Sequence, residues 1–104
     1  MNKEVKRISE KIKVLEKEIK EKYKAEIIGI FGSYVRGEQN KKSDIDVLVK
    51  FYDGATLFEF VGLSNFLEEK LHIKKVDIVC YDTVREELKK QILSEVFYIW
   101  EEMW

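Results

Sequence analysis

The first 23 residues of the chain alternate apolar and charged positions at the spacing of an α-helix. Apolar side chains recur three or four residues apart, at Val5, Ile8, Ile12, Leu15 and Ile19. This spacing places them on one stripe of a helix, with lysine and glutamate side chains facing water. The pattern predicts an amphipathic helix over residues 1–23 that packs on the domain's own sheet. A coiled-coil seam would fit the same stripe, but the stripe is shorter than the three to four heptads that such a seam requires.

Three short apolar runs further along the chain have the composition of β-strands. "AEIIGIF" stops at Gly32, and "IDVLVKF" follows after a polar loop. Both runs are rich in β-branched residues, so they predict two neighbouring strands joined by a functional loop. A third run, "KVDIVCY", predicts another strand.

Two more helices are predicted, one between the second and third strands and one after the third. Thr56 and Thr83 are each followed three residues later by a glutamate, which is the pattern of an N-terminal capping box. Apolar residues at helical spacing then continue to Leu71 and to Met103, and the second series predicts a long closing helix over residues 83–104. The predicted order is α-β-β-α-β-α, an α/β fold in which helices pack on a small mixed β-sheet.

Length and charge limit the kinds of protein that this chain can be. A chain of 104 residues can bury enough surface for one compact domain, so we expect a single domain over residues 1–104. The 19 Lys and Arg residues nearly balance the 20 Asp and Glu residues, and this balance does not favour nucleic acid or a membrane as an obligatory partner. No segment reaches the ~20 apolar residues that span a bilayer, and no signal peptide is recognisable. We therefore expect a soluble, cytoplasmic protein.

The chain has one cysteine, Cys80, and one histidine, His72. A single cysteine cannot form an intramolecular disulfide, which fits a reducing compartment. Cys80 lies inside an apolar run without a cation beside it, so a small strand residue is favoured over a reactive thiol. His72 has no second histidine with which to share a metal, and we interpret it as a boundary residue after the second helix.

Two aspartates stand at the beginning of the second predicted strand. Asp44 and Asp46 are two residues apart, and residues two apart in a strand point to the same face. Two carboxylates so close repel each other unless a cation binds both. Mg²⁺ prefers oxygen ligands and is usually held by one or two carboxylates together with substrate phosphates. The pair therefore predicts a Mg²⁺ site for a nucleoside triphosphate.

A glycine–serine pair precedes these aspartates by ten residues. Gly32 lets the backbone approach a phosphate, and Ser33 adds a hydroxyl donor at the end of the first strand. Arg36 contributes a cation in the loop, and Ser43 is placed to orient one of the aspartates. Taken separately, Arg36 is also an ordinary solvated loop residue and Ser43 an ordinary turn former. Together with the aspartates, these residues predict a clamp for a polyphosphate.

A third carboxylate, Asp77, lies within the third predicted strand. A lone charge among apolar neighbours is costly unless a partner or a metal compensates it, and Lys75 could serve as a simple partner. If this strand lies beside the one that begins at Asp44, the three acids form a triad suited to two Mg²⁺ ions and in-line displacement at phosphorus. Asp77 would then accept the proton of the attacking hydroxyl.

The stretch "GSYVRGEQNKKSDID" with the later "VDIV" resembles the minimal nucleotidyltransferase (MNT) antitoxins, the single-domain branch of the DNA polymerase beta-like nucleotidyltransferase superfamily. Their signature is Gly-Ser, ten residues, then Asp-x-Asp, and here the third acid is Asp77. Val35 departs from the small alanine that is frequent after the tyrosine, which could tighten the loop. The resemblance covers nearly the whole chain and implies the nucleotidyltransferase fold.

The resemblance also implies an activity and a partner. Members of this branch use Mg²⁺ and ATP to transfer AMP onto a hydroxyl group. They typically act as the antitoxin of a toxin–antitoxin module, in which the acceptor is a tyrosine of a HEPN-domain ribonuclease. The short chain leaves no room for a second lobe, which also favours a partner. Phe97, Tyr98 or Trp104 on the closing helix would then be exposed for binding, although they could equally cover the edge of the sheet.

Four other interpretations remain. The fold could be a catalytically silent module that neutralises a partner by contact, but a binding module has no physical need for three gathered acids. The same chemistry could act on RNA or a small molecule. A metal-dependent glycosyltransferase would also use Asp-x-Asp, but it needs a longer chain and leaves Gly32 and Ser33 unexplained. A nucleic-acid adaptor that uses the basic first helix is disfavoured by the glutamates interspersed there.

Overall fold

The computed structural model describes residues 3–32 and 44–100. Its elements in chain order are α1 (Lys3–Tyr23), β1 (Ala25–Phe31), β2 (Ile45–Phe51), α3 (Leu57–Leu71), β3 (Val76–Cys80), the 3-10 turn η1 (Tyr81–Thr83), α4 (Glu86–Glu95) and β4 (Phe97–Tyr98). The predicted α/β class is confirmed, and the first five of these elements lie where the hydrophobic pattern predicts them.

The strands form one mixed sheet in the order β3-β2-β1-β4. β1 is antiparallel to both β2 and β4, whereas β2 and β3 run parallel. The parallel pair requires a crossover, and α3 supplies it between the end of β2 and the start of β3. As a result, the amino ends of β2 and β3 lie at the same edge of the sheet.

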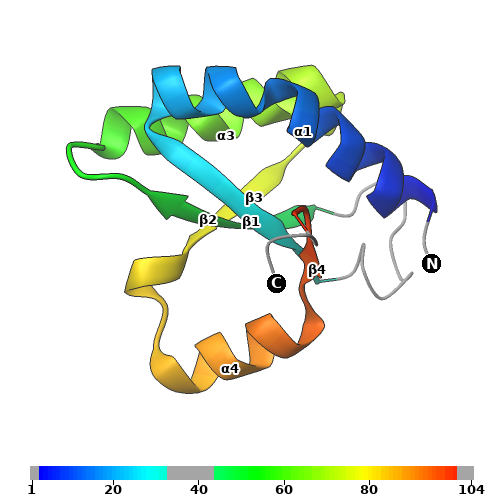
Figure 1. The fold of residues 1–104 in the computed structure, drawn as a ribbon, viewed down its shortest axis with the longest axis vertical. Helices are drawn as coiled ribbons and strands as arrows, with labels where there is room; N and C mark the ends of the chain where they lie inside the picture. The colour runs from blue at the N-terminus through cyan, green and yellow to red at the C-terminus, as the bar shows by residue number, and fades with distance from the viewer. Residues whose placement is uncertain (1–2, 33–43, 101–104) are drawn as a thin grey trace.

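Helices α1 and α3 lie side by side on one face of the sheet, and α4 lies on the other side (Figure 1). The apolar stripe of α1 packs into the core between helices and sheet, so the stripe serves the chain's own sheet as predicted. Tyr23 closes the junction of the two helices. Its ring stacks at a tilt on Phe66, with 5.1 Å between centroids, and a Cβ on Gly62 would lie 2.9 Å from it.

The boundaries of α3 follow from its capping residues. The Thr56 side chain accepts a hydrogen bond from the backbone N–H of Phe58, and the Glu59 carboxylate accepts one from the backbone N–H of Thr56, so the predicted capping box is present. The helix ends at His72, whose left-handed backbone (φ 55°) and exposed side chain fit the predicted boundary role. Leu57 and Val61 belong to the apolar series of this helix but are exposed.

The predicted closing helix over residues 83–104 is wrong in both its beginning and its end. Thr83 belongs to η1 and donates its hydroxyl proton to the Cys80 carbonyl, while α4 begins only at Glu86. The chain becomes extended at Val96 (ψ 139°), and β4 follows. Residues 101–104 lie outside the described part of the chain, so the predicted exposure of Trp104 has no structural counterpart.

Tertiary pairing explains why the helix stops at Glu95. Phe97 and Tyr98 pair with Ile30 and Gly29 of β1, and the next residue, Ile99, donates its N–H to the Ile28 carbonyl. Gly29 makes this approach possible, because a Cβ there would lie 2.5 Å from the Phe97 carbonyl oxygen. The apolar residues that fit a helical stripe are thus used to extend the sheet.

The aromatic side chains expected on the surface of the closing helix are not exposed in the described residues. Phe97 is half-buried and packs against the hydrophobic core, and the half-buried Tyr98 donates its hydroxyl proton to the Leu93 carbonyl. Among the described residues, the large apolar side chain with the highest exposure is instead Phe58 on α3, at 87%. No helix in the described ranges is long and apolar enough to cross a membrane.

Candidate functional site

Asp46 and Asp77 face each other across the parallel strands β2 and β3, where they are register partners. Adjacent strands are about 4.8 Å apart, and register partners project to the same face. The neighbours of Asp46, Ile45 and Val47, are fully buried on the helix-covered face, so the two aspartates project to the opposite face. The expectation that the third strand lies beside the second is therefore confirmed.

Asp44 stands just before β2 and shares the alternation of Asp46. Its side chain is 40% exposed and that of Asp77 is 41% exposed, so both carboxylates are reachable from solvent. The three predicted acids thus lie at one edge and on one face of the sheet. They come from the amino ends of two strands whose backbones are fixed by sheet pairing.

Gly32 ends β1 directly beside this edge. Its backbone has φ +85°, a conformation that side-chain-bearing residues rarely adopt, and a Cβ there would overlap the Oδ2 atom of Asp46. Phe31, the preceding residue, is the register partner of Asp46. The sequence predicts that Gly32 lets a phosphate approach the backbone, and the structure adds that a glycine is needed here to admit the Asp46 carboxylate.

Three predicted site residues, Ser33, Arg36 and Ser43, lie outside the described residues. The possible helical turn in "SYVRG" lies there as well. Their predicted roles in phosphate binding and in orienting an aspartate stay predictions.

Lys75 is a member of the site whose position the sequence did not reveal. Its Nζ atom lies 3.8 Å from Asp44 Oδ2 and 3.8 Å from Asp77 Oδ1. From the sequence, Lys75 is expected only as a partner for Asp77. The signal for a larger role is its spacing, because a residue two positions before Asp77 in a strand projects to the same face.

The donor atoms at this edge fit a hard divalent cation in their chemistry. Carboxylates are typical Mg²⁺ ligands, and the absence of a Cβ on Gly32 leaves the room that the Asp46 carboxylate occupies. Within residues 3–32 and 44–100, however, no three acidic, histidine or cysteine side chains have converged closely enough to hold a metal ion. The lysine ammonium lies between two of the acids instead.

At the carboxyl ends of β2 and β3, the same face of the sheet carries basic and aromatic side chains. Lys50 lies 3.5 Å from the Asp82 carboxylate, and its ammonium is 5.8 Å from the Tyr81 ring centroid. The ammonium of Lys89 on α4 is 4.3 Å from the same centroid. This end is therefore held by cation–π contacts and an ion pair and carries no acidic cluster.

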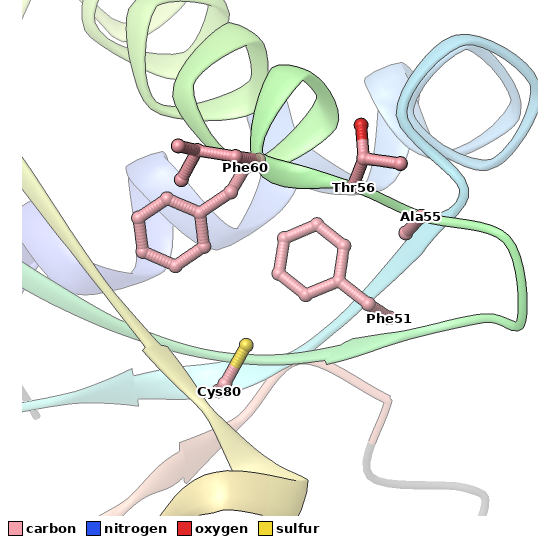
Figure 2. Close-up of a pocket in the computed structure, with 6 residues that line it drawn as sticks. Phe51, Ala55, Thr56, Phe60 and Cys80 are labelled. Carbon is pink, nitrogen blue, oxygen red and sulfur yellow. The ribbon is translucent and has the colours of Figure 1, made fainter.

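A pocket of about 300 Å³ opens at the carboxyl ends of β2 and β3, at the opposite edge from the aspartates. In Figure 2, Phe51 and Phe60 point into it from β2 and α3, and the Cys80 sulfur points toward them. Burial raises the pKa of the Cys80 thiol, which agrees with the prediction of an unreactive strand cysteine. The lining is apolar, and the pocket lies apart from the acidic residues.

A mixed sheet with aspartates opposed on two parallel strands, beside a glycine turn, is the arrangement expected of a nucleotidyltransferase. The comparison with known families agrees. Residues 10–102 match the family described as Polymerase beta, Nucleotidyltransferase. The chain belongs to this family and is a nucleotidyltransferase, and the resemblance seen in the sequence is confirmed.

Individual relatives carry names that are more specific than the family description. MJ0126 of Methanocaldococcus jannaschii, provisionally named a protein adenylyltransferase, is 41% identical over 93 residues, which cover 88% of this chain and 94% of the relative. The protein adenylyltransferase MntA of Thermococcus cleftensis is 40% identical over 83 residues, covering 80% and 83%. A solved structure described as a toxin–antitoxin with AMP-PNP has a TM-score of 0.72 at 28% identity, covering 88% of this chain and 72% of that one.

Proposed function

We propose that the chain transfers AMP from ATP to a tyrosine hydroxyl of a HEPN-domain ribonuclease and thereby acts as the antitoxin of a toxin–antitoxin module. The observation that carries the proposal is the register pairing of Asp46 with Asp77 beside Gly32. Similarity to two proteins named as protein adenylyltransferases and to a toxin–antitoxin structure with AMP-PNP supports the reaction and the role. The HEPN partner and the tyrosine follow from the family resemblance.

In this proposal Asp44, Asp46 and Asp77 would hold two Mg²⁺ ions. Bound metal would neutralise the triphosphate and the negative charge that develops at phosphorus. Gly32 leaves room for the Asp46 carboxylate, and Ser33, Arg36 and Ser43 contribute donors and charge for the phosphates. Sheet pairing fixes the backbones of Asp46 and Asp77, which lowers the cost of orienting their carboxylates.

AMP transfer is then a single displacement at the α-phosphorus of ATP. The acceptor oxygen forms a bond to the α-phosphorus of ATP, and the bond from that phosphorus to the oxygen bridging to the β-phosphate breaks. Pyrophosphate leaves, AMP remains on the acceptor, and the hydroxyl proton passes to Asp77. Asp77 suits this role because it is 41% exposed and lies opposite Asp46.

The need for a partner rests on the small extent of the domain. The described residues supply one sheet and the helices packed on it, and the acids lie at its rim, partly exposed. A protein acceptor that covers this rim would exclude water and position its hydroxyl. We place the reaction in the cytoplasm, because the proposed substrate is ATP and a single cysteine fits a reducing compartment.

The decisive experiment mixes the full chain with the cognate HEPN protein, ATP labelled in the α-phosphate, and Mg²⁺. We expect label on the HEPN protein, mapped to a tyrosine by mass spectrometry, and loss of its ribonuclease activity. Label on RNA or on a small molecule alone would retain the nucleotidyltransferase chemistry and refute the antitoxin role. Neutralisation of the toxin without any label would identify a silent binding module.

A further inference from the structure

Lys75 is held at the entrance of the two parallel strands by its backbone. Its carbonyl accepts a hydrogen bond of 3.2 Å from the Ile45 N–H, and the residues that follow are paired in register from Ile45 and Val76 onward. Strand alternation then puts Asp44, Asp46, Lys75 and Asp77 on one face. The lysine backbone is therefore fixed, and only its flexible four-carbon side chain is free to move.

The ammonium of Lys75 compensates two carboxylates at once. It lies 3.8 Å from an oxygen of Asp44 and 3.8 Å from an oxygen of Asp77. Without it, Asp44 and Asp77 would each lose this positive charge and keep their repulsion of the other carboxylates on the face. The Lys75 side chain is 62% exposed, so each pair is weak and is easily exchanged for a stronger cation.

The Lys75 ammonium and a metal ion compete for the same position between Asp44 and Asp77. A divalent ion bound between Asp44 and Asp77 would be repelled by a positive charge 3.8 Å from both. In keeping with this, the described acidic side chains do not form a metal-ready cluster while Lys75 lies between two of them. The lysine must leave this position before the carboxylates can close on a metal.

We propose that Lys75 is an internal counter-cation that holds Asp44 and Asp77 in the metal-free protein and is displaced when a divalent metal binds. Lys75 is thus a positioning residue, and its charge sets the metal concentration at which the site fills. The inference rests on the metal site of the proposed function. Beyond that function, the inference is that Lys75 lowers the metal affinity of the site and stabilises the aspartates when no metal is bound.

The test compares Lys75→Met, which removes the charge and keeps much of the stem, with Lys75→Arg, which keeps the charge. Lys74→Met is the matched control, since Lys74 is an exposed neighbour that takes part in neither ion pair. Mn²⁺ binding to the full chain is measured by electron paramagnetic resonance without nucleotide. We expect Lys75→Met to bind Mn²⁺ about 3–10-fold more tightly, and the other two variants to match the wild type.

Thermal unfolding gives a second readout that does not depend on activity. In EDTA, Lys75→Met should lower the melting temperature by roughly 2–4 °C, because the aspartates lose their cation. Saturating Mn²⁺ should abolish this difference, and raising the salt concentration should reduce it, since exposed charges are screened. Lys74→Met should show neither effect.

Two outcomes would overturn the inference. Unchanged Mn²⁺ affinity together with an unchanged melting temperature in EDTA would make Lys75 an ordinary surface lysine. Weaker Mn²⁺ binding in Lys75→Met would show that Lys75 supports the metal site and does not compete with it. Asp44→Asn with Asp46→Asn separates this from failure of the proposed function: if that double variant binds Mn²⁺ like the wild type, the metal site itself is wrong.

Discussion

Gly32 and Asp46 lie so close that the carboxylate occupies the place of a Cβ on Gly32. Gly32→Ala should therefore displace Asp46 and also strain a backbone at φ +85°. We expect a loss of roughly 1–3 kcal/mol in the free energy of unfolding, measured in urea, and loss of Mn²⁺ binding.

Gly54→Ala is the matched control for this change. Gly54 has a similar backbone, φ +92°, but a Cβ there would meet only the end of the Lys24 side chain, at 3.5 Å. It should lose stability through strain alone and keep its Mn²⁺ affinity. If both alanine variants bind Mn²⁺ normally, the contact between Gly32 and Asp46 has no role in the site.

Replacing Asp44 and Asp46 with asparagine tests the proposed metal ligands. AMP transfer should fall to background, because two of the three carboxylates that would hold Mg²⁺ are gone. The free energy of unfolding should stay within about 1 kcal/mol of the wild type, since the lost ion pair to Lys75 is exposed and the repulsion between acids is relieved. Full transfer activity in the folded double variant would remove these residues from the catalytic assignment.

Asp77→Asn separates proton transfer from metal binding. If Asp77 accepts the proton of the attacking hydroxyl, the single-turnover rate should fall by about 10²–10⁴-fold while ATP affinity changes much less. Both quantities are measured on the same variant with the partner present. An equal loss in the two would reassign Asp77 as a plain metal ligand.

The local sequence pattern is sufficient to predict most of the helices and strands, but it does not predict the geometry of the site. Helix periodicity identified α1 and α3, and β-branched runs identified the first three strands, because these signals depend on neighbours in sequence. The pairing of Asp46 with Asp77 depends on β2 and β3 being parallel, which α3 decides by crossing over the sheet. From the sequence, the three acids are expected to form a triad only if the strand with Asp77 lies beside the strand that begins at Asp44.

The position of Lys75 and the end of α4 could not be predicted for a related reason. Lys75 has two partners only because Asp44 comes from another strand, and sequence spacing relates it to Asp77 alone. The segment after Glu95 fits a helical stripe equally well, and its pairing with β1 at Gly29, where a Cβ would block the approach, favours the strand. Such choices depend on tertiary packing, which outweighs weak local preference.

The last prediction concerns this C-terminal segment and uses a pair of phenylalanines. Phe97 packs against the core on β4, whereas Phe58 is 87% exposed on α3. Phe97→Ser should therefore lower the free energy of unfolding by about 1–3 kcal/mol, somewhat less than for a fully buried phenylalanine, and speed hydrogen exchange at the Ile99 N–H, which bonds to Ile28. Phe58→Ser should change stability by about 0.5 kcal/mol or less. If Phe97→Ser leaves both stability and exchange unchanged, β4 is not part of the sheet in solution, and the longer closing helix expected from the sequence becomes the better description of residues 96–100.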